Sequence, residues 1–129
     1  MKRLIVNIIL FFVAVILLST IGVFGLLYAI IWTVFNFKKV SFMKYWIDLI
    51  FSINIGIDQI GNVLLSTFLN SCCIVNKSHH PFGNVDHTIS HVLAINYFDG
   101  NLTRFGKMIV KILETIDKNH MYKSLKQHS

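Results

Sequence analysis

The chain has 129 residues, of which 54% are hydrophobic and only 14% are charged, and its formal net charge is +6. Soluble domains contain about 25% charged residues, so this composition argues against an ordinary soluble domain and indicates a small membrane protein. A basic balance suits the cytoplasmic side of a membrane and anionic lipid. The basic residues are scattered and form no nucleic-acid-binding motif, so we expect no nucleic acid partner.

The strongest signal is an apolar run near the N-terminus. Met1-Lys2-Arg3 precedes uncharged residues from Leu4 to Phe37, and Lys38 and Lys39 end the run. At about 1.5 Å per residue a straight helix of this run is roughly 50 Å long, against a hydrocarbon core of about 30 Å. The run exceeds a signal-peptide core and lacks a clear cleavage site, so we predict an uncleaved signal-anchor.

Two topologies fit this length. One is a single tilted helix over about Ile8–Trp32, and the other is a hairpin that turns near Ser19–Gly22. The hairpin places both basic flanks on one side, but its legs of about 16 residues are short for a span, so we favour the single helix. Small residues at helical spacing predict a face for helix packing or self-association: Ser19, Gly22, Gly25 and Ala29.

A second apolar helix is predicted over Tyr45–Leu69. Its polar residues recur at steps of three, four or seven and form one narrow stripe, with Asp58 beside it: Asp48, Ser52, Gln59, Asn62, Ser66 and Asn70. We expect this stripe to be the solvated side of a helix that lies in the membrane interface. The alternative is a second crossing, with the stripe turned toward partners or a water-filled path.

The C-terminal half is more polar. A turn-rich loop over residues 76–84 precedes a short helix that we expect Asp86 to cap and that ends near Ile95. The last predicted helix has its apolar face at helical spacing and basic residues on the other. The apolar face comprises Leu102, Phe105, Met108, Ile109, Ile112, Leu113 and Ile116. The sequence thus predicts an all-α protein in three segments, an N-terminal transmembrane helix (1–39) followed by amphipathic helices (40–74 and 75–129).

Residues able to support chemistry are few. His87 and His91 have a metal-ligand spacing, but two ligands do not make a site, so we expect no metal and no cofactor. Ser90 lies between them with Asp86 nearby, yet sequence neighbours on a helix do not form a triad. Cys72 and Cys73 are adjacent, which disfavours a disulfide between them. The expectation is a protein without enzymatic activity.

Three short elements occur in a fixed order. They are Asp58-Gln59-Ile60-Gly61-Asn62, then Gly83-Asn84-Val85-Asp86-His87-Thr88-Ile89-Ser90, then Asp117-Lys118-Asn119-His120 with Lys123-Ser124 after it. They resemble Asp-Gln-x-x-Asn, Gly-x-Pro-Asp-Glu-Thr-Ile-Ser and Asp-x-x-His elements in a family of short, uncharacterised proteins of tailed bacteriophages. Val85 and His87 depart from the proline and glutamate of that pattern. The resemblance covers about half of the chain and implies a phage or prophage origin, often near lysis genes.

Two hypotheses follow. One is a holin-like or accessory lysis protein of the bacterial inner or host cell membrane, without catalytic activity, whose anchor helices assemble. The other is a membrane-tethered module that binds a host or phage protein. The residues expected to bind a partner are Asp58, Gln59, Asn62, Asp86, Thr88, Ser90 and His120. Their alternative role is capping and helix packing.

Overall fold

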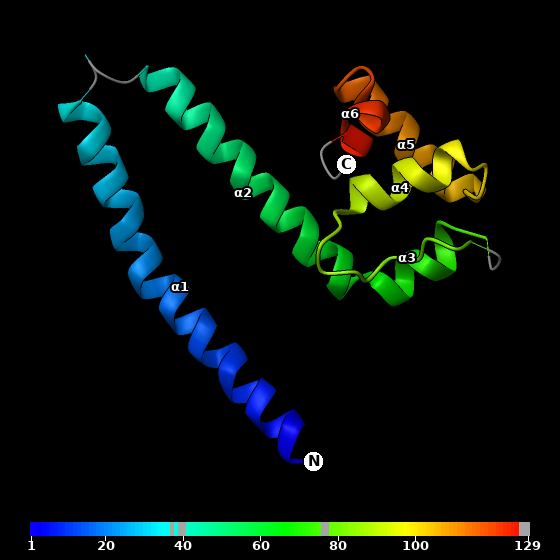
Figure 1. Cartoon of the computed structure of the whole chain (residues 1–129), viewed down its shortest axis with the longest axis horizontal. Coiled ribbons are helices and arrows are strands. Elements are labelled where there is room, and N and C mark those ends of the chain that lie inside the picture. The colour runs from blue at the N-terminus through cyan, green and yellow to red at the C-terminus, as the bar shows by residue number, and fades with distance from the viewer. Residues whose placement is uncertain (37, 39–40, 76–77, 127–129) are drawn as a thin grey trace. The chain divides into compact units, whose positions relative to one another are not determined.

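The computed structural model describes residues 1–36, 38, 41–75 and 78–126 of the chain. Over these residues the protein is all-α, as predicted, and contains six helices (Figure 1). They are α1 (Lys2–Phe35), α2 (Phe42–Leu64), α3 (Ser66–Cys72), α4 (Ile89–Phe98), α5 (Arg104–Ile116) and α6 (His120–Lys126). The predicted anchor boundary at Lys39 and the predicted loop start at Asn76 and Lys77 lie outside the described residues.

The chain divides within α2 into an N-terminal unit, Met1–Leu49, and a C-terminal unit, Ile50–Ser129. In the N-terminal unit α1 is one continuous helix of 34 residues. The predicted single helix is confirmed and the hairpin alternative is wrong. Ser19 and Thr20, at the expected turn, keep the helix intact because their hydroxyls donate to the carbonyls of Val15 and Ile16, at 2.6 and 2.7 Å.

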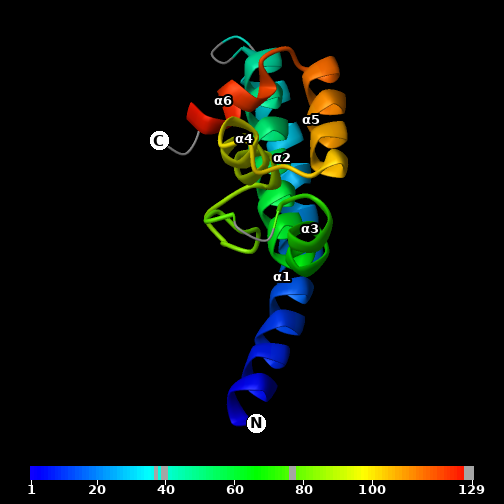
Figure 2. The ribbon, with the colours of Figure 1, turned by 90° about the vertical axis from the view of Figure 1, so that its right-hand side faces the viewer.

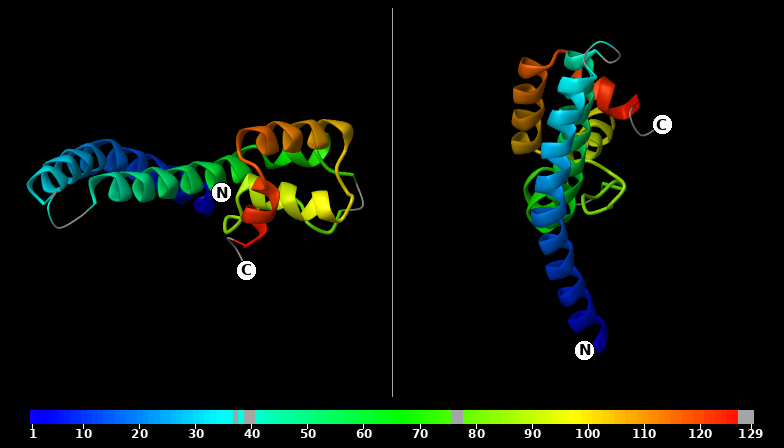
Figure 3. Two further views of the ribbon diagram at one scale, coloured as in Figure 1. Left: turned by 90° about the horizontal axis from the view of Figure 1, so that it is seen from above. Right: turned by 90° about the vertical axis from the view of Figure 1, so that its left-hand side faces the viewer.

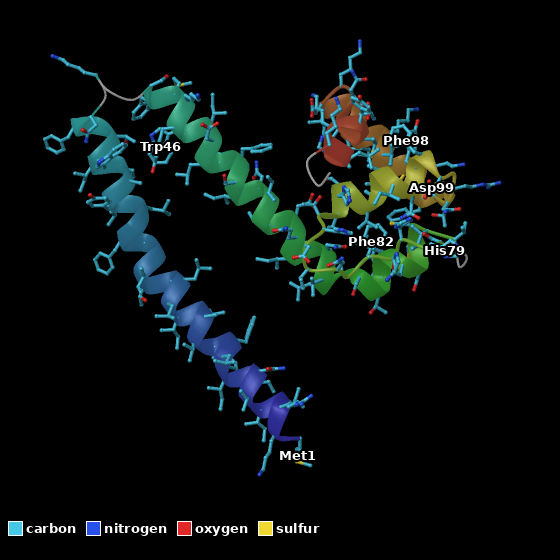
Figure 4. All side chains as sticks on the ribbon, in the orientation of Figure 1. Met1, Trp46, His79, Phe82, Phe98 and Asp99 are labelled. Carbon is cyan, nitrogen blue, oxygen red and sulfur yellow. The ribbon has the colours of Figure 1, made fainter. Side chains whose placement is uncertain are left out.

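The last turns of α1 lie against the beginning of α2. The Trp32 and Tyr45 rings contact each other with centroids 5.9 Å apart, and Trp46 follows on the same helix (Figure 4). Thr33 is buried there and donates its hydroxyl to the Ala29 carbonyl at 2.9 Å. Aromatic side chains therefore join the two helices of the N-terminal unit.

Two helices, α1 and α2, are long and apolar enough to cross a membrane. A core helix of a soluble protein would be buried, but the most apolar part of α1 has no buried residue. A long helix whose exposed side chains are mostly apolar is compatible with a membrane location.

The C-terminal unit has its own core. Figures 2 and 3 show α4, α5 and α6 close together, and the Phe68 ring of α3 contacts the Phe105 ring of α5. Ten side chains form the buried cluster: Leu69, Cys73, Ile74, Phe82, Val92, Leu93, Ala94, Leu102, Val110 and Met121. Phe82 comes from the loop before α4 and fills the space next to α3 (Figure 4). Burial raises the pKa of the Cys73 thiol, and the neighbouring Cys72 adds to the shift.

The α5 helix is rotated relative to the prediction. Its buried positions are Gly106 and Val110, whereas Phe105, Met108 and Ile112 are exposed. The cause is a close approach: a Cβ on Gly106 would lie 2.4 Å from the Cys73 carbonyl oxygen. The predicted apolar face was therefore wrong at four of its seven positions, Phe105, Met108, Ile112 and Ile116, because a glycine rather than a large apolar residue faces the core.

Candidate functional site

The polar stripe of α2 binds the chain's own loop. Asn62 is fully buried, and its Nδ2 donates to the carbonyls of Asn84 and His87, both at 2.8 Å. Its Oδ1 accepts the Gly83 N–H at 3.1 Å. Because a buried amide must find partners for both of its ends, Asn62 fixes the course of the loop. The prediction of a solvated stripe is wrong at this position.

Asn70 and Gln59 hold the two ends of the same loop. Asn70 donates to the Phe82 carbonyl at 3.0 Å and accepts the Phe82 N–H at 2.8 Å. Its side-chain amide thus makes the two hydrogen bonds with the Phe82 backbone that a neighbouring β-strand would make. Gln59 Nε2 donates to the Asp86 carbonyl at 3.5 Å. Gln59 and Asn62, two residues predicted to bind a partner, therefore support the loop.

The start of α4 is capped from two directions. Thr88 is the N-cap residue, and its Oγ1 accepts the His91 N–H at 3.0 Å. The Asp58 carboxylate, from α2, accepts the N–H groups of Ile89 and Ser90 at 3.1 and 3.3 Å. A carboxylate at a helix N-terminus is favoured by the helix dipole.

The predicted cap at Asp86 is wrong. Asp86 is exposed and lies before the helix, where its N–H donates to Asn84 Oδ1 at 3.1 Å. The reason is that residues 84–87 form a turn closed by the His87 N–H on the Asn84 carbonyl, so the helix begins only at Ile89.

His120 is oriented by a carboxylate. Its Nδ1 lies 3.1 Å from Asp117 Oδ2, and Lys123 binds the other oxygen of the same carboxylate. These hydrogen bonds, first from Lys123 and then from His120, hold the pKa of Asp117 below its ordinary 3.8. A neutral imidazole that donates from Nδ1 carries its lone pair on Nε2. That Nε2 is buried and has no hydrogen-bond partner among the described residues.

Glu114 fixes the turn that carries His120. Its carboxylate accepts the N–H groups of Asn119 and Met121 at 2.9 and 2.8 Å. Asn119 lies in the left-handed region, with a φ of 63°, which asparagine tolerates better than most residues. The chain therefore reverses sharply between α5 and α6 and brings His120 back toward the start of α4.

These elements meet at a pocket of about 220 Å³ inside the C-terminal unit. Its lining comprises Phe51, Asn54, Ile55, Asp58, Thr88, Ser90, His120 and Ser124. Asp58, Thr88, Ser90 and His120 belong to the set expected to bind a partner, and they come from three separate elements of the sequence. Gln59 lies instead at a different hollow, together with Val85.

Two of the pocket's polar residues were missed. Asn54 lies one helical turn before Asp58, a spacing that could have identified it. Ser124 lies next to His91, because its carbonyl oxygen is 3.0 Å from His91 Nδ1. No sequence signal links His91 to Ser124, since the two are brought together by the packing of α4 and α6.

The pocket offers mainly hydrogen-bond acceptors. The Asp58 carboxylate accepts hydrogen bonds from N–H or O–H groups, and His120 Nε2 is an acceptor in the neutral tautomer that donates from Nδ1. Ser90 is not hydrogen-bonded to that Nε2, so the nucleophile–base pair of a hydrolase is not formed. The His87 and His91 rings contact each other edge-on, 4.7 Å apart. In the described part of the chain, no three His, Cys, Asp or Glu side chains are placed to hold a metal ion.

The small residues of α1 lie in two environments. Gly25 and Ala29 line a hollow of about 330 Å³ with Tyr28, Trp32 and Tyr45, within the N-terminal unit. Gly22 lies one turn earlier, where an added Cβ would meet only the side chain of Leu18, 3.5 Å away. The C-terminal end of the predicted packing face, at Gly25 and Ala29, therefore adjoins the beginning of α2.

Comparison with known proteins gives no relative. No family model matches the sequence, and no curated protein or solved structure shows significant similarity to the chain.

Proposed function

We propose that this chain is a membrane-anchored interaction module of phage type, in which α1 is the anchor and the C-terminal unit binds a protein partner. The observation that carries the proposal is the convergence of Asp58, Ser90 and His120 on one pocket. These residues come from the three motif elements that resemble the phage family. The module binds without catalysing a reaction.

The hydrogen bonds of α2 support a tether rather than a second crossing. Residues from Asp58 onward bind the loop before α4 and the first turn of that helix. The apolar part before them, residues 42–57, spans roughly 24 Å at about 1.5 Å per residue, which is shorter than a hydrocarbon core of about 30 Å. An interfacial α2 keeps the Asp58 carboxylate out of the bilayer centre, where a charge is costly.

The pocket chemistry defines the partner. A lysine or arginine side chain, or a chain terminus with an ammonium group, supplies N–H donors to the Asp58 carboxylate. We therefore propose that the partner inserts a cationic side chain.

Site-specific photocrosslinking tests this function. A benzoyl-phenylalanine at position 51, on the rim of the pocket, should give one discrete crosslinked partner in the native bacterial host. The same group at position 97, an exposed site on α4, is the matched control and should not. Crosslinking at position 51 should be lost in Asp58→Asn and His120→Leu variants that still fold. Equal crosslinking from positions 51 and 97, or no effect of the two substitutions, would refute the proposal.

A holin-like function is the second candidate, because α1 and α2 are both apolar and long enough to cross a membrane. In that case α1 helices associate through Ser19, Gly22, Gly25 and Ala29 until the membrane fails. Expression in bacteria should then collapse the membrane potential, and a chain that ends at Ser71 should remain toxic. Reporter fusions after residues 39 and 77 should report opposite sides of the membrane. Unchanged potential at high expression excludes this function and leaves the tethered module.

A further inference from the structure

The helix α5 carries an apolar stripe that the core of the unit does not cover. Phe105, Met108, Ile112 and Ile116 are spaced by three or four residues, so they lie on one side of the helix. Their exposed fractions are 39%, 51%, 51% and 78%. A soluble domain rarely leaves four large apolar side chains of one helix in water, so this stripe indicates a further interaction.

The stripe continues onto α3. The Phe68 and Phe105 rings contact each other edge-on with centroids 6.3 Å apart, and Phe68 is itself exposed. Leu65, also exposed, lies three residues before Phe68 and extends the surface by one turn. We name this surface the α3–α5 patch and define it by Leu65, Phe68, Phe105, Met108, Ile112 and Ile116.

Positive charges follow one edge of this patch. Arg104, Lys107 and Lys111 are exposed and share the flank of α5 next to the stripe, and Lys118 is exposed just beyond the helix. Nearby carboxylates are engaged elsewhere. Glu114 accepts the N–H groups of Asn119 and Met121, and Asp117 is paired with Lys123. The edge of the patch is therefore strongly basic.

We propose that the α3–α5 patch docks on the anionic surface of the membrane into which α1 inserts. Its apolar side chains enter the boundary between headgroups and acyl chains, and its cations contact lipid phosphates. An apolar stripe with a basic edge matches anionic lipid in both hydrophobicity and charge. The proposal rests on the membrane location proposed above, because the anchor keeps the patch at high effective concentration near the bilayer.

The full chain in lipid nanodiscs provides the test. A fluorophore at position 112, introduced by Ile112→Cys in a Cys72→Ser background, should be quenched by nitroxide-labelled acyl chains when the disc contains phosphatidylglycerol. Quenching should be weaker in discs of phosphatidylcholine alone. A label at position 85, an exposed site in the loop before α4, is the matched control and should stay unquenched in both lipids. The pair Lys107→Gln and Lys111→Gln should shift the docking equilibrium roughly 30-fold toward the undocked state, at about 1 kcal/mol for each cation.

Three results would overturn the inference. If the fluorophore at position 112 is quenched no more than the one at position 85 in anionic discs, the patch does not dock on the membrane. Equal quenching of position 112 in discs with and without phosphatidylglycerol would show that the cations of the patch do not contribute to docking. If position 112 is protected from the nitroxide quencher and two chains crosslink to each other, the patch binds a second copy of the chain instead of lipid. Retention of the chain in membranes after carbonate extraction measures the anchor separately, so failure of the location and failure of the docking are distinguishable.

Discussion

Asn62 holds Gly83 in a backbone conformation that few other residues adopt. The Gly83 N–H donates to Asn62 Oδ1 at 3.1 Å, and the φ of Gly83 is +116°. A Cβ at Gly83 would also lie 3.1 Å from the Cβ of Ser66. The loop can therefore pass close to α3 only with glycine at this position, and the buried amide of α2 keeps it there.

Replacing Asn62 should release the loop. Asn62→Leu keeps the number and branching of the side-chain heavy atoms but leaves the N–H of Gly83 and the carbonyls of Asn84 and His87 without their partner. We expect the free energy of unfolding to fall by about 3 kcal/mol, because buried polar groups without partners are costly. Pulse proteolysis in detergent micelles measures this difference, and hydrogen exchange locates it in residues 83–90.

Gln59→Ala is the matched control for this substitution. Gln59 makes one long hydrogen bond, of 3.5 Å, to the Asp86 carbonyl, so its loss should change the stability by less than about 1 kcal/mol. Equal losses for the two variants would contradict the structural role assigned to Asn62.

Only part of this site was predictable from the sequence. The helical spacing of Gln59, Asn62 and Asn70 identified a polar stripe with Asp58 beside it, because side-chain periodicity is a local property. What the stripe binds was not predictable. Its partners are backbone groups of Phe82–Ser90, and nothing in a single sequence indicates which distant backbone a buried amide will meet. For the same reason the convergence of Asp58 with His120 emerges only from the packing of α2, α4 and α6.

The start of α4 shows the limit of local rules. Both Asp86 and Thr88 are good N-cap residues, and the sequence prediction chose the first. The structure places Thr88 at the cap because Asp58, from another helix, accepts the N–H groups of the two residues that follow it.

Paired substitutions test this assignment. Thr88→Ala should lower the free energy of unfolding by about 1 kcal/mol because the cap is lost. Asp86→Ala should change it by less than about 0.5 kcal/mol, since the side chain is exposed and lies outside the helix. Thermal unfolding followed by circular dichroism compares the two variants. If Asp86→Ala lowers the free energy of unfolding more than Thr88→Ala does, Asp86 is the cap, as predicted from the sequence.

Gly106 sets the rotation of α5. Gly106→Ala would place a Cβ 2.4 Å from the Cys73 carbonyl oxygen, and this backbone atom cannot move aside as a flexible side chain would. We expect a loss of stability of about 3 kcal/mol or more, measured by pulse proteolysis. Gly56→Ala is the control, because beyond the adjoining helix backbone no atom lies within 4 Å of its added Cβ, and a helical alanine should stabilise α2 by about 1 kcal/mol. If Gly106→Ala leaves the stability unchanged, α5 does not approach Cys73 this closely.

The imidazole of His87 should make the stability of the C-terminal unit depend on pH. Burial, and next the neighbouring His91, lower the pKa of His87 below its ordinary 6.5, while Asp86 opposes the shift. The folded protein then binds fewer protons than the unfolded chain, so acid favours unfolding. The contribution of His87 should be fully present above pH 6.5 and decline as the pH falls through the folded pKa.

Proton NMR of the His87 ring measures this pKa directly, and pulse proteolysis at pH 8 and pH 5.5 measures the change in stability. In a His87→Gln variant the loss of stability between the two values should be smaller, because one of the groups that bind protons on unfolding is gone. A ring that titrates at or above pH 6.5 would contradict the prediction. So would a variant that loses as much stability in acid as the original chain, since the pH dependence would then arise from other groups.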